Sequence, residues 1–171
     1  MRLFIAVNFT DEVKKRLLEI QERLRSQSLS GNFTRPENLH LTLAFLGETP
    51  EEKLSSLFQI IEDIKVTPFE VFFNHTGCFI HSRKELWWIG AGENDPGLRQ
   101  LGDIHGQLLS RLLDARFSVD ERPFNPHITL GREIKHSRPI SLCCPEITVS
   151  INRICLMKSE RIKGVLTYTA L

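Results

Sequence analysis

The chain has 171 residues, of which 41% are hydrophobic and 25% are charged. These proportions are typical of a globular protein with a packed core, and they exclude a disordered or fibrous chain. Lys and Arg number 22 against 21 Asp and Glu, so the net charge of +1 excludes binding to nucleic acid through overall positive charge, and any such contact must be local.

The first third of the chain predicts a strand, a helix, a loop and a second strand. RLFIAVN at 2–8 is short and apolar, which favours a strand. Thr10 then caps a helix. Its apolar residues recur on one face and are Val13, Leu17, Ile20 and Leu24. The polar stretch 26–38 is expected to be a loop, and a strand follows at 40–47.

Two more helices are expected. TPEE at 49–52 has the form of a capping box, and the helix that it opens should end near Lys65. Its inward residues are expected to be Leu54, Leu57, Phe58 and Ile61. Asp95 and Pro96 cap and begin the other helix. The apolar residues of that helix are Leu98, Leu101, Ile104, Leu108 and Leu112.

The remaining segments favour strands. These are expected at 69–74, 86–91, 127–131, 146–157 and 164–171, with a loop at 81–85 and a connection at 117–126. The whole order predicts a mixed α+β fold with antiparallel pairing. Because no linker-like stretch divides the chain, we expect residues 1–171 to form a single domain.

The lengths of the apolar runs and the spacing of the cysteines indicate the cellular compartment of the protein. No apolar run approaches the length of a membrane helix, and the first residues become charged too early for a signal peptide. The cysteines, without a CxxC pair or regular spacing, favour free thiols over a zinc ribbon or a disulfide framework. They are Cys78, Cys143, Cys144 and Cys155. We expect a cytoplasmic protein without a membrane partner.

One pattern occurs twice, as HLTL at 40–43 and HITL at 127–130. Alternate residues of a strand face opposite ways, so His40 and Thr42 should share a polar face. The opposite, apolar face should carry Leu41, Leu43 and Phe45. His127 and Thr129 form the matching pair in the second copy. A single such pair is usually structural, but two copies facing one cleft would gather two imidazoles and two hydroxyls into an anion site.

Two histidines suit displacement at phosphorus. The unperturbed pKa of an imidazole is about 6.5, so near neutral pH one ring can accept a proton while the other donates one. The attacking and leaving oxygens lie on opposite sides of the phosphorus, and hydroxyl groups can stabilise its other oxygens. A zinc site is the competing hypothesis. It would call for three protein ligands, and the chain has no HExxH-like spacing and no carboxylate in either copy, so no metal is expected.

RPENLHLTLAFLG at 35–47 and PFNPHITLGR at 123–132 resemble the two signature motifs of the 2H phosphoesterase superfamily. The branch that they resemble is the RNA 2′,3′-cyclic phosphodiesterases, also called 2′-5′ RNA ligases. Similar flanking stretches are RLFIAV at the start, GCFIHSRKELWWIGA in the middle and LMKSERIKGVLTYTAL at the end. The chain departs from the family pattern at Asn125, in the spacing from Gly164 to Tyr168, and after Phe79, where a proline is absent.

The resemblance implies the roles of the motif residues. His40 would be the proton donor to the leaving 3′ oxygen and His127 the proton acceptor that activates water, while Thr42 and Thr129 would bind the phosphate. The implied fold has two related lobes, with antiparallel sheets and outer helices around a central cleft. The implied reaction converts RNA 2′,3′-cyclic phosphate ends into 2′-phosphates without a metal or cofactor, and in reverse makes 2′-5′ linkages.

Other side chains are weaker candidates. Arg132 follows the second copy and could bind phosphate, and Phe45 or the outward one of Trp87 and Trp88 could stack on a base. Packing is the alternative for each. His75, His81, His105 and His136 are expected to be structural or solvated. Lys158 and Arg161 could add charge at the cleft, although a solvated loop is the simpler interpretation.

Three functions are left open. The first is the RNA cyclic phosphodiesterase, acting as a monomer on RNA or nucleotides with 2′,3′-cyclic phosphate ends. The second is a phosphodiesterase for another 2′,5′-linked or cyclic nucleotide. The third is a non-catalytic module that binds RNA ends, although binding alone would be served as well by arginine or lysine as by the two histidines.

Overall fold

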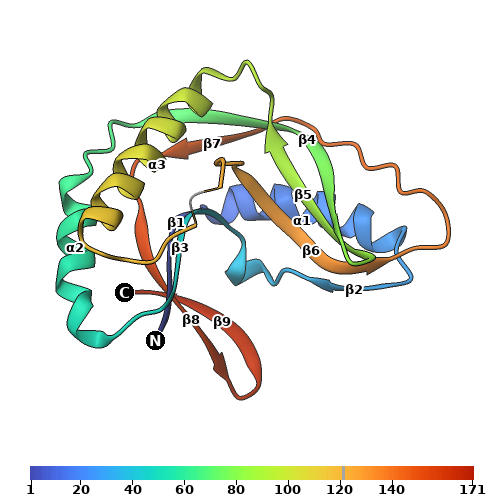
Figure 1. Ribbon diagram of the computed structural model, residues 1–171. Coiled ribbons are helices and arrows are strands. Elements are labelled where there is room, and N and C mark those ends of the chain that lie inside the picture. The colour runs from blue at the N-terminus through green and yellow to red at the C-terminus, as the bar shows by residue number, and fades with distance from the viewer. Residues whose placement is uncertain (121) are drawn as a thin grey trace.

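The computed structural model describes residues 1–120 and 122–171, and their strands form two antiparallel sheets (Figure 1). The four-stranded sheet has the order β3 (His40–Glu48), β1 (Arg2–Asn8), β8 (Cys155–Ile162), β9 (Val165–Ala170). The five-stranded sheet has the order β2 (Ser30–Phe33), β6 (His127–Lys135), β5 (Lys84–Ala91), β4 (Phe69–His81), β7 (Ile147–Ile151). Each sheet therefore contains one copy of the repeated pattern, on β3 and on β6.

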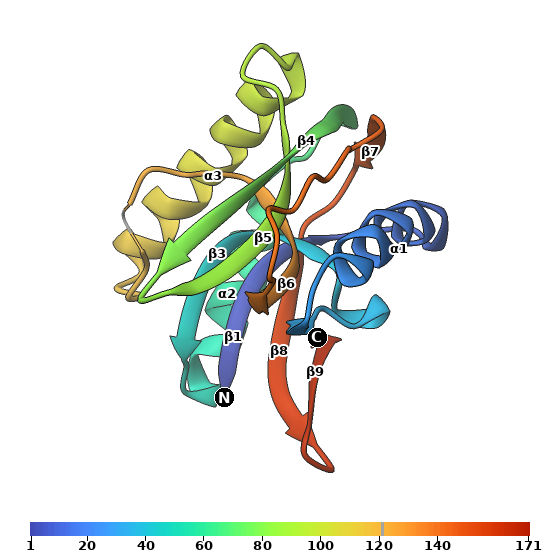
Figure 2. The same ribbon diagram turned by 90° about the vertical axis from the view of Figure 1, so that its right-hand side faces the viewer.

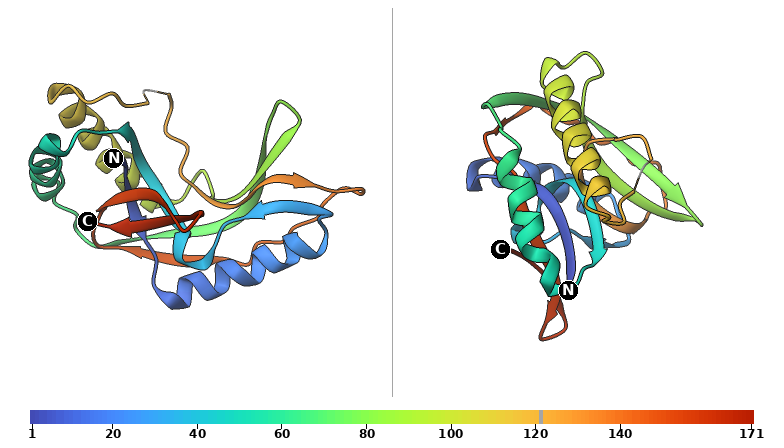
Figure 3. Two further views of the ribbon diagram at one scale, coloured as in Figure 1. Left: turned by 90° about the horizontal axis from the view of Figure 1, so that it is seen from below. Right: turned by 60° about the vertical axis from the view of Figure 1, so that its left-hand side comes forward.

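The helices lie outside the sheets, and seen from below α1 lies far from the pair formed by α2 and α3 (Figure 3). Helix α1 (Asp11–Ser26) packs on β2, β6 and β7, although it follows β1 of the other sheet. Helix α2 (Leu54–Asp63) packs on β8 and on α3 (Pro96–Asp114), and α3 reaches from β4 to β3. None of the described helices is long and apolar enough to cross a membrane.

Along its length the chain crosses several times from one sheet to the other (Figure 2). Its largest apolar cluster includes Leu3 and Leu41 of the four-stranded sheet as well as Ile128 and Val149 of the five-stranded sheet. The α+β class and the antiparallel sheets with outer helices are as predicted. The continuous core supports the further proposal that residues 1–171 form a single bilobal domain.

Two helix starts confirm the capping predictions. The Val13 N–H donates to the Thr10 hydroxyl at 3.3 Å, and the Gly97 N–H donates to the Asp95 carboxylate at 2.7 Å. The other Asp95 oxygen accepts from the Phe72 N–H at 2.8 Å, so this cap also ties α3 to β4. The inward faces of both helices are largely as expected, with Leu17, Ile20, Leu24, Leu101, Ile104, Leu108 and Leu112 buried.

The prediction that Thr49 begins a capping box is wrong. The Thr49 hydroxyl donates to the Gly47 carbonyl instead, and a short 3₁₀ turn, η2 (Glu51–Lys53), precedes α2. Thr49 is 3% exposed because its backbone exchanges hydrogen bonds with Met1 at the end of the sheet. Leu57 is buried as predicted, and Leu54 and Ile61 are partly buried against the core. Phe58 is exposed, contrary to the prediction, whereas Ile60 is buried.

Two predicted loops contain strands. Residues 26–38 include β2 and a 3₁₀ turn, η1 (Pro36–Asn38), because the polar SGNF stretch pairs with β6 as an edge strand. The loop at 81–85 shrinks to Ser82 and Arg83, both with positive φ. A two-residue turn of this kind matches the twist of the strands, so β4 and β5 extend almost to the tip of their hairpin.

Candidate active site

Both motif strands contain a β-bulge at the same place, directly after the threonine. In β3 the pairing with β1 skips Leu43, and in β6 the pairing with β5 skips Leu130. The next two residues shift face, so the fifth residue after each histidine turns away from the core. These residues are Phe45 and Arg132. The prediction that Phe45 lies on the core face is therefore wrong, because the bulge breaks the alternation.

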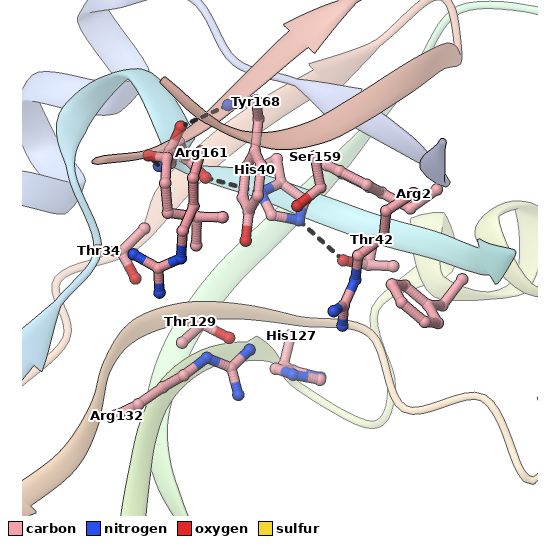
Figure 4. A pocket seen from close by; sticks show the side chains of 14 residues that line it. Arg2, Thr34, His40, Thr42, His127, Thr129, Arg132, Ser159, Arg161 and Tyr168 are labelled. Carbon is pink, nitrogen blue, oxygen red and sulfur yellow. Dashed lines mark hydrogen bonds between the residues drawn. The ribbon is translucent and has the colours of Figure 1, made fainter. Parts of the chain in front are cut away.

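The two motif strands meet at a cleft of about 470 Å³ between the sheets (Figure 4). Its walls carry every site residue expected from the sequence, namely His40, Thr42, Phe45, His127, Thr129 and Arg132. Each sheet contributes a histidine, a threonine and one further side chain. The structure thus brings the two copies together as expected.

His40 is held by hydrogen bonds at both ring nitrogens. Its Nδ1 lies 2.7 Å from the Asn38 carbonyl oxygen, which can only accept, so Nδ1 carries a hydrogen. Its Nε2 lies 2.9 Å from the Thr42 hydroxyl and is the atom that can exchange a proton. The ring packs against Phe4 and Tyr168, with centroids 4.9 and 5.2 Å away. Its orientation is therefore set before any ligand binds.

His127 is likewise held by a backbone carbonyl, but only at Nδ1. Its Nδ1 donates to the Asn125 carbonyl oxygen at 2.8 Å, which directs Nε2 to the cleft. Phe79 contacts the imidazole edge-on at 5.2 Å, and Trp88 lies 6.3 Å away. Both histidines thus hold Nδ1 as a donor to the backbone and leave Nε2 for acid or base chemistry.

Burial lowers the pKa of both histidines below their ordinary value. The positive charge of Arg132 lowers the pKa of each ring further, whereas the hydrogen bonds to the Asn38 and Asn125 carbonyls act in the opposite direction. The charge of His127 also contributes to the lowered pKa of His40. Without a ligand, both rings therefore favour the neutral form near neutral pH. An anion in the cleft would offset the effect of Arg132 and favour protonation.

Asn38 is a site residue that the sequence reasoning missed. Its side chain is 5% exposed, donates to the Leu166 carbonyl at 2.9 Å and accepts from the Tyr168 N–H at 3.1 Å. It thereby fixes β9, the strand that carries Tyr168, next to the carbonyl that orients His40. The signal was present, because asparagine stands two residues before each motif histidine.

Gln21 is the corresponding anchor below the second motif. Its Nε2 donates to the carbonyl of the bulged residue Leu130 at 2.8 Å and to that of Thr34 at 2.7 Å. Gln21 is 4% exposed on the apolar face of α1, directly after Ile20. A polar residue on the apolar face of this helix was the sequence feature that could have identified the anchor.

An aromatic cluster continues from His127 along β4 and β5. Trp87 packs on the core, and its Nε1 donates to Glu85, whereas Trp88 is the outward one of the pair. The Trp88 ring lies 5.1 Å from Phe79 and 5.5 Å from His75. It covers Gly77, where a Cβ would come within 2.1 Å of the ring. The absence of a side chain at Gly77 thus makes room for Trp88 beside His127.

The other candidates are placed as follows. His105 stacks on Phe124 at 4.1 Å, and His136 contacts the Glu85 carboxylate at 3.1 Å, so both have structural partners. The expectation of a loop at Lys158 and Arg161 is wrong, because both lie on β8. Lys158 pairs with Glu160, whereas Arg161 lines the cleft. Within residues 1–120 and 122–171, no three His, Cys, Asp or Glu side chains form a group that could hold a metal ion.

Known proteins are similar to this chain in sequence. The family described as LigT like phosphoesterase matches residues 7–88 and 93–167. The Thermotoga maritima protein named RNA 2′,3′-cyclic phosphodiesterase is 37% identical over 138 residues, covering 77% of this chain and 70% of that protein. The Escherichia coli protein of the same name is 30% identical over 173 residues, covering 99% and 93%.

Solved structures are similar over nearly the whole chain. Escherichia coli LigT complexed with 3′-AMP has a TM-score of 0.83 and 28% identity, covering 99% of this chain and 94% of that one. A Thermus thermophilus protein, TT0787, has a TM-score of 0.81 and 30% identity, covering 100% and 95%. Fold and site together define a phosphoesterase of the two-histidine class. This chain belongs to the LigT-like phosphoesterase family.

Proposed function

We propose that this protein hydrolyses RNA 2′,3′-cyclic phosphate ends to 2′-phosphomonoesters, using His40 and His127 as the acid and base. The observation that carries the proposal is the pair of imidazoles, one from each sheet, with Nδ1 of each bound to the backbone and Nε2 of each available to the cleft. Relatives named RNA 2′,3′-cyclic phosphodiesterase support this substrate, as does a related structure holding 3′-AMP.

The reaction needs one proton to enter and one to leave on opposite sides of the phosphorus. His127 Nε2 takes a proton from water as the water oxygen bonds to phosphorus. The bond from phosphorus to the 3′ oxygen breaks, and protonated His40 gives its Nε2 proton to that oxygen. The phosphate stays on the 2′ oxygen. His127 leaves the step protonated and His40 neutral, and exchange with solvent restores both.

The surroundings of the two rings support this division of roles. His40 Nε2 already faces the Thr42 hydroxyl, which can accept from the protonated ring and hold its proton ready. His127 Nε2 has no hydrogen-bond partner within the described chain, which suits a base that must meet water. The substrate's negative charge favours protonation of His40 when it binds, because it offsets the charge of Arg132.

The other motif side chains stabilise charge on the phosphate. Thr42 and Thr129 can donate hydroxyl hydrogens to the non-bridging oxygens, and the Arg132 guanidinium can bind the same oxygens. Phe45 is 44% exposed at the cleft and offers an apolar face to a base. The same acid and base would serve 2′-5′ ligation, in which a ribose 5′-hydroxyl replaces water as the nucleophile.

The protein is proposed to act as a monomer in the cytoplasm. Both histidines come from one chain, so the cleft needs no partner copy. The four cysteines are free thiols, which fits a reducing compartment.

Hydrolysis of a 2′,3′-cyclic mononucleotide in EDTA, from about pH 5 to 9, tests the proposal. We expect a bell-shaped profile and a 2′-phosphate product, with His40→Ala and His127→Ala each lowering the rate by about 10² to 10⁴. His81→Ala is the matched control, because this exposed histidine ends β4 outside the cleft, and it should keep the parent rate. Turnover that EDTA abolishes, or that survives both motif substitutions, would refute the two-histidine mechanism.

A further inference from the structure

The cleft continues past the two histidines to a second group of donors. Arg161 on β8 and Thr34, just after β2, lie together at one end of it, with Arg132 between them and His127 (Figure 4). Arg2 lies at the other end, near Thr42. Because Arg161 belongs to the four-stranded sheet and Thr34 follows a strand of the five-stranded sheet, both lobes build this end.

The charge of the cleft exceeds what one phosphodiester would neutralise. Arg2, Arg132 and Arg161 line it, and none of the described residues that line it is acidic. No carboxylate of residues 1–120 or 122–171 forms an ion pair with any of these arginines. The whole chain has a net charge of only +1, so positive charge is concentrated here. Such a cleft favours a ligand with more than one negative group.

Arg161 and Thr34 are arranged to bind an oxyanion. One Arg161 nitrogen donates to the Gly164 carbonyl at 2.9 Å, which anchors the side chain and leaves its other N–H groups free to donate. The Thr34 backbone is held by Leu130 and Gln21, whereas its hydroxyl has no partner among the described residues. Arg2 is less available, since its guanidinium lies over the Phe45 ring at 5.0 Å.

We propose that Arg161 and Thr34 bind the internucleotide phosphate that precedes the terminal nucleoside of an RNA 3′ end. The inference rests on the proposed function and specifies its substrate, since a mononucleotide 2′,3′-cyclic phosphate lacks this second phosphate. The cleft then places the cyclic phosphate between the two histidines and the next phosphate at Arg161. Oligonucleotide ends are therefore preferred to mononucleotides.

The test compares kcat/KM for a dinucleotide and a mononucleotide that both end in a 2′,3′-cyclic phosphate. The parent should prefer the dinucleotide by about tenfold, the effect of one charge-assisted contact. A dinucleotide with an uncharged methylphosphonate linkage should lose that preference. Arg161→Ala should lower the ratio by about tenfold, and Arg161→Lys should retain part of it because the charge remains.

Lys163→Asn is the matched control. It removes one positive charge from the turn of the same hairpin without changing a residue that lines the cleft. Lys163 has a φ of 50°, which asparagine tolerates. This variant should keep the parent ratio, so that a general effect of charge is separated from a contact with Arg161.

The outcomes are distinct. Equal kcat/KM for the charged dinucleotide and the mononucleotide would overturn the subsite, and a preference that Arg161→Ala leaves intact would overturn its assignment to Arg161. If the parent hydrolyses neither substrate, the proposed function fails. Calorimetric titration with the matching dinucleotide and mononucleotide 2′-phosphates then still tests the subsite. If the subsite exists, Arg161→Ala binds the dinucleotide more weakly than the parent does, and equal affinities of the two proteins for the dinucleotide would overturn it.

Discussion

Replacing Asn38 with alanine removes a buried amide that joins β9 to the segment before His40. Two hydrogen bonds are lost, one to the Leu166 carbonyl and one from the Tyr168 N–H. Each leaves a partly buried backbone group without its partner, at a cost of about 1–2 kcal/mol. We therefore expect Asn38→Ala to lower the free energy of unfolding by about 2–4 kcal/mol, measured by urea denaturation.

The same change should impair catalysis. Tyr168 packs on the His40 ring, and the Asn38 carbonyl accepts from its Nδ1, so a shift of this segment turns the imidazole away from the cleft. A displacement of about 1 Å can lower a rate by roughly 10²-fold, and we expect a loss of kcat of about that size for cyclic nucleotide hydrolysis. Weakening the bond to the carbonyl also removes an influence that raises the pKa of His40, so this pKa should fall further, as measured by NMR.

Leu57→Ala is the control for stability alone. Leu57 is fully buried on α2 and lies outside the cleft, and its truncation should cost about 2–5 kcal/mol. A variant that loses stability to this extent but keeps kcat shows that destabilisation by itself does not impair turnover. If Asn38→Ala loses stability while its kcat and the pKa of His40 stay at parent values, the positioning role of Asn38 is refuted.

Three further predictions follow from burial and packing. The pKa values of His40 and His127 are lowered in the folded state, so the unfolded chain binds more protons than the folded chain below about pH 6.5. The free energy of unfolding should therefore fall from pH 7 to 5, and it should fall less in the His40→Ala/His127→Ala double variant. Gly77→Ala should displace Trp88, cost about 1–3 kcal/mol and change the tryptophan fluorescence, whereas Gly102→Ala, with open space around it, should not destabilise. Thermal unfolding should show one transition by both fluorescence and circular dichroism, and two separated transitions would contradict a single bilobal domain.

Local patterns were sufficient to find the catalytic candidates and most elements. His-x-Thr on a strand places both side chains on one face whatever the surroundings, so both pairs could be identified before the fold was known. The caps at Thr10 and Asp95 were equally clear, because each is a hydrogen bond between residues close in sequence. The capping box at Thr49 had the same local form and failed, because Met1 at the end of the sheet binds the Thr49 backbone.

Pairing partners decided what local patterns could not. Both bulges arise from the register of a motif strand against a neighbour, β1 for β3 and β5 for β6, and they turn Phe45 and Arg132 to the cleft. The edge strand β2 likewise forms only because β6 is present to pair with it. Neither register is encoded in the spacing of apolar residues along a single strand.

The sequence by itself determined the α+β class, the two histidine and threonine pairs and the chemistry that they suit, because these depend on residue type and a period of two. Only the tertiary structure decided which backbone carbonyls orient the imidazoles and that Arg161 reaches the same cleft. It also decided that Asn38 anchors β9 beside the first motif and that Gln21 anchors Leu130 of the second motif. Asn38 bonds to residues 128 and 130 positions away, and Gln21 to one 109 positions away. Contacts at such separations arise only when the whole chain has folded.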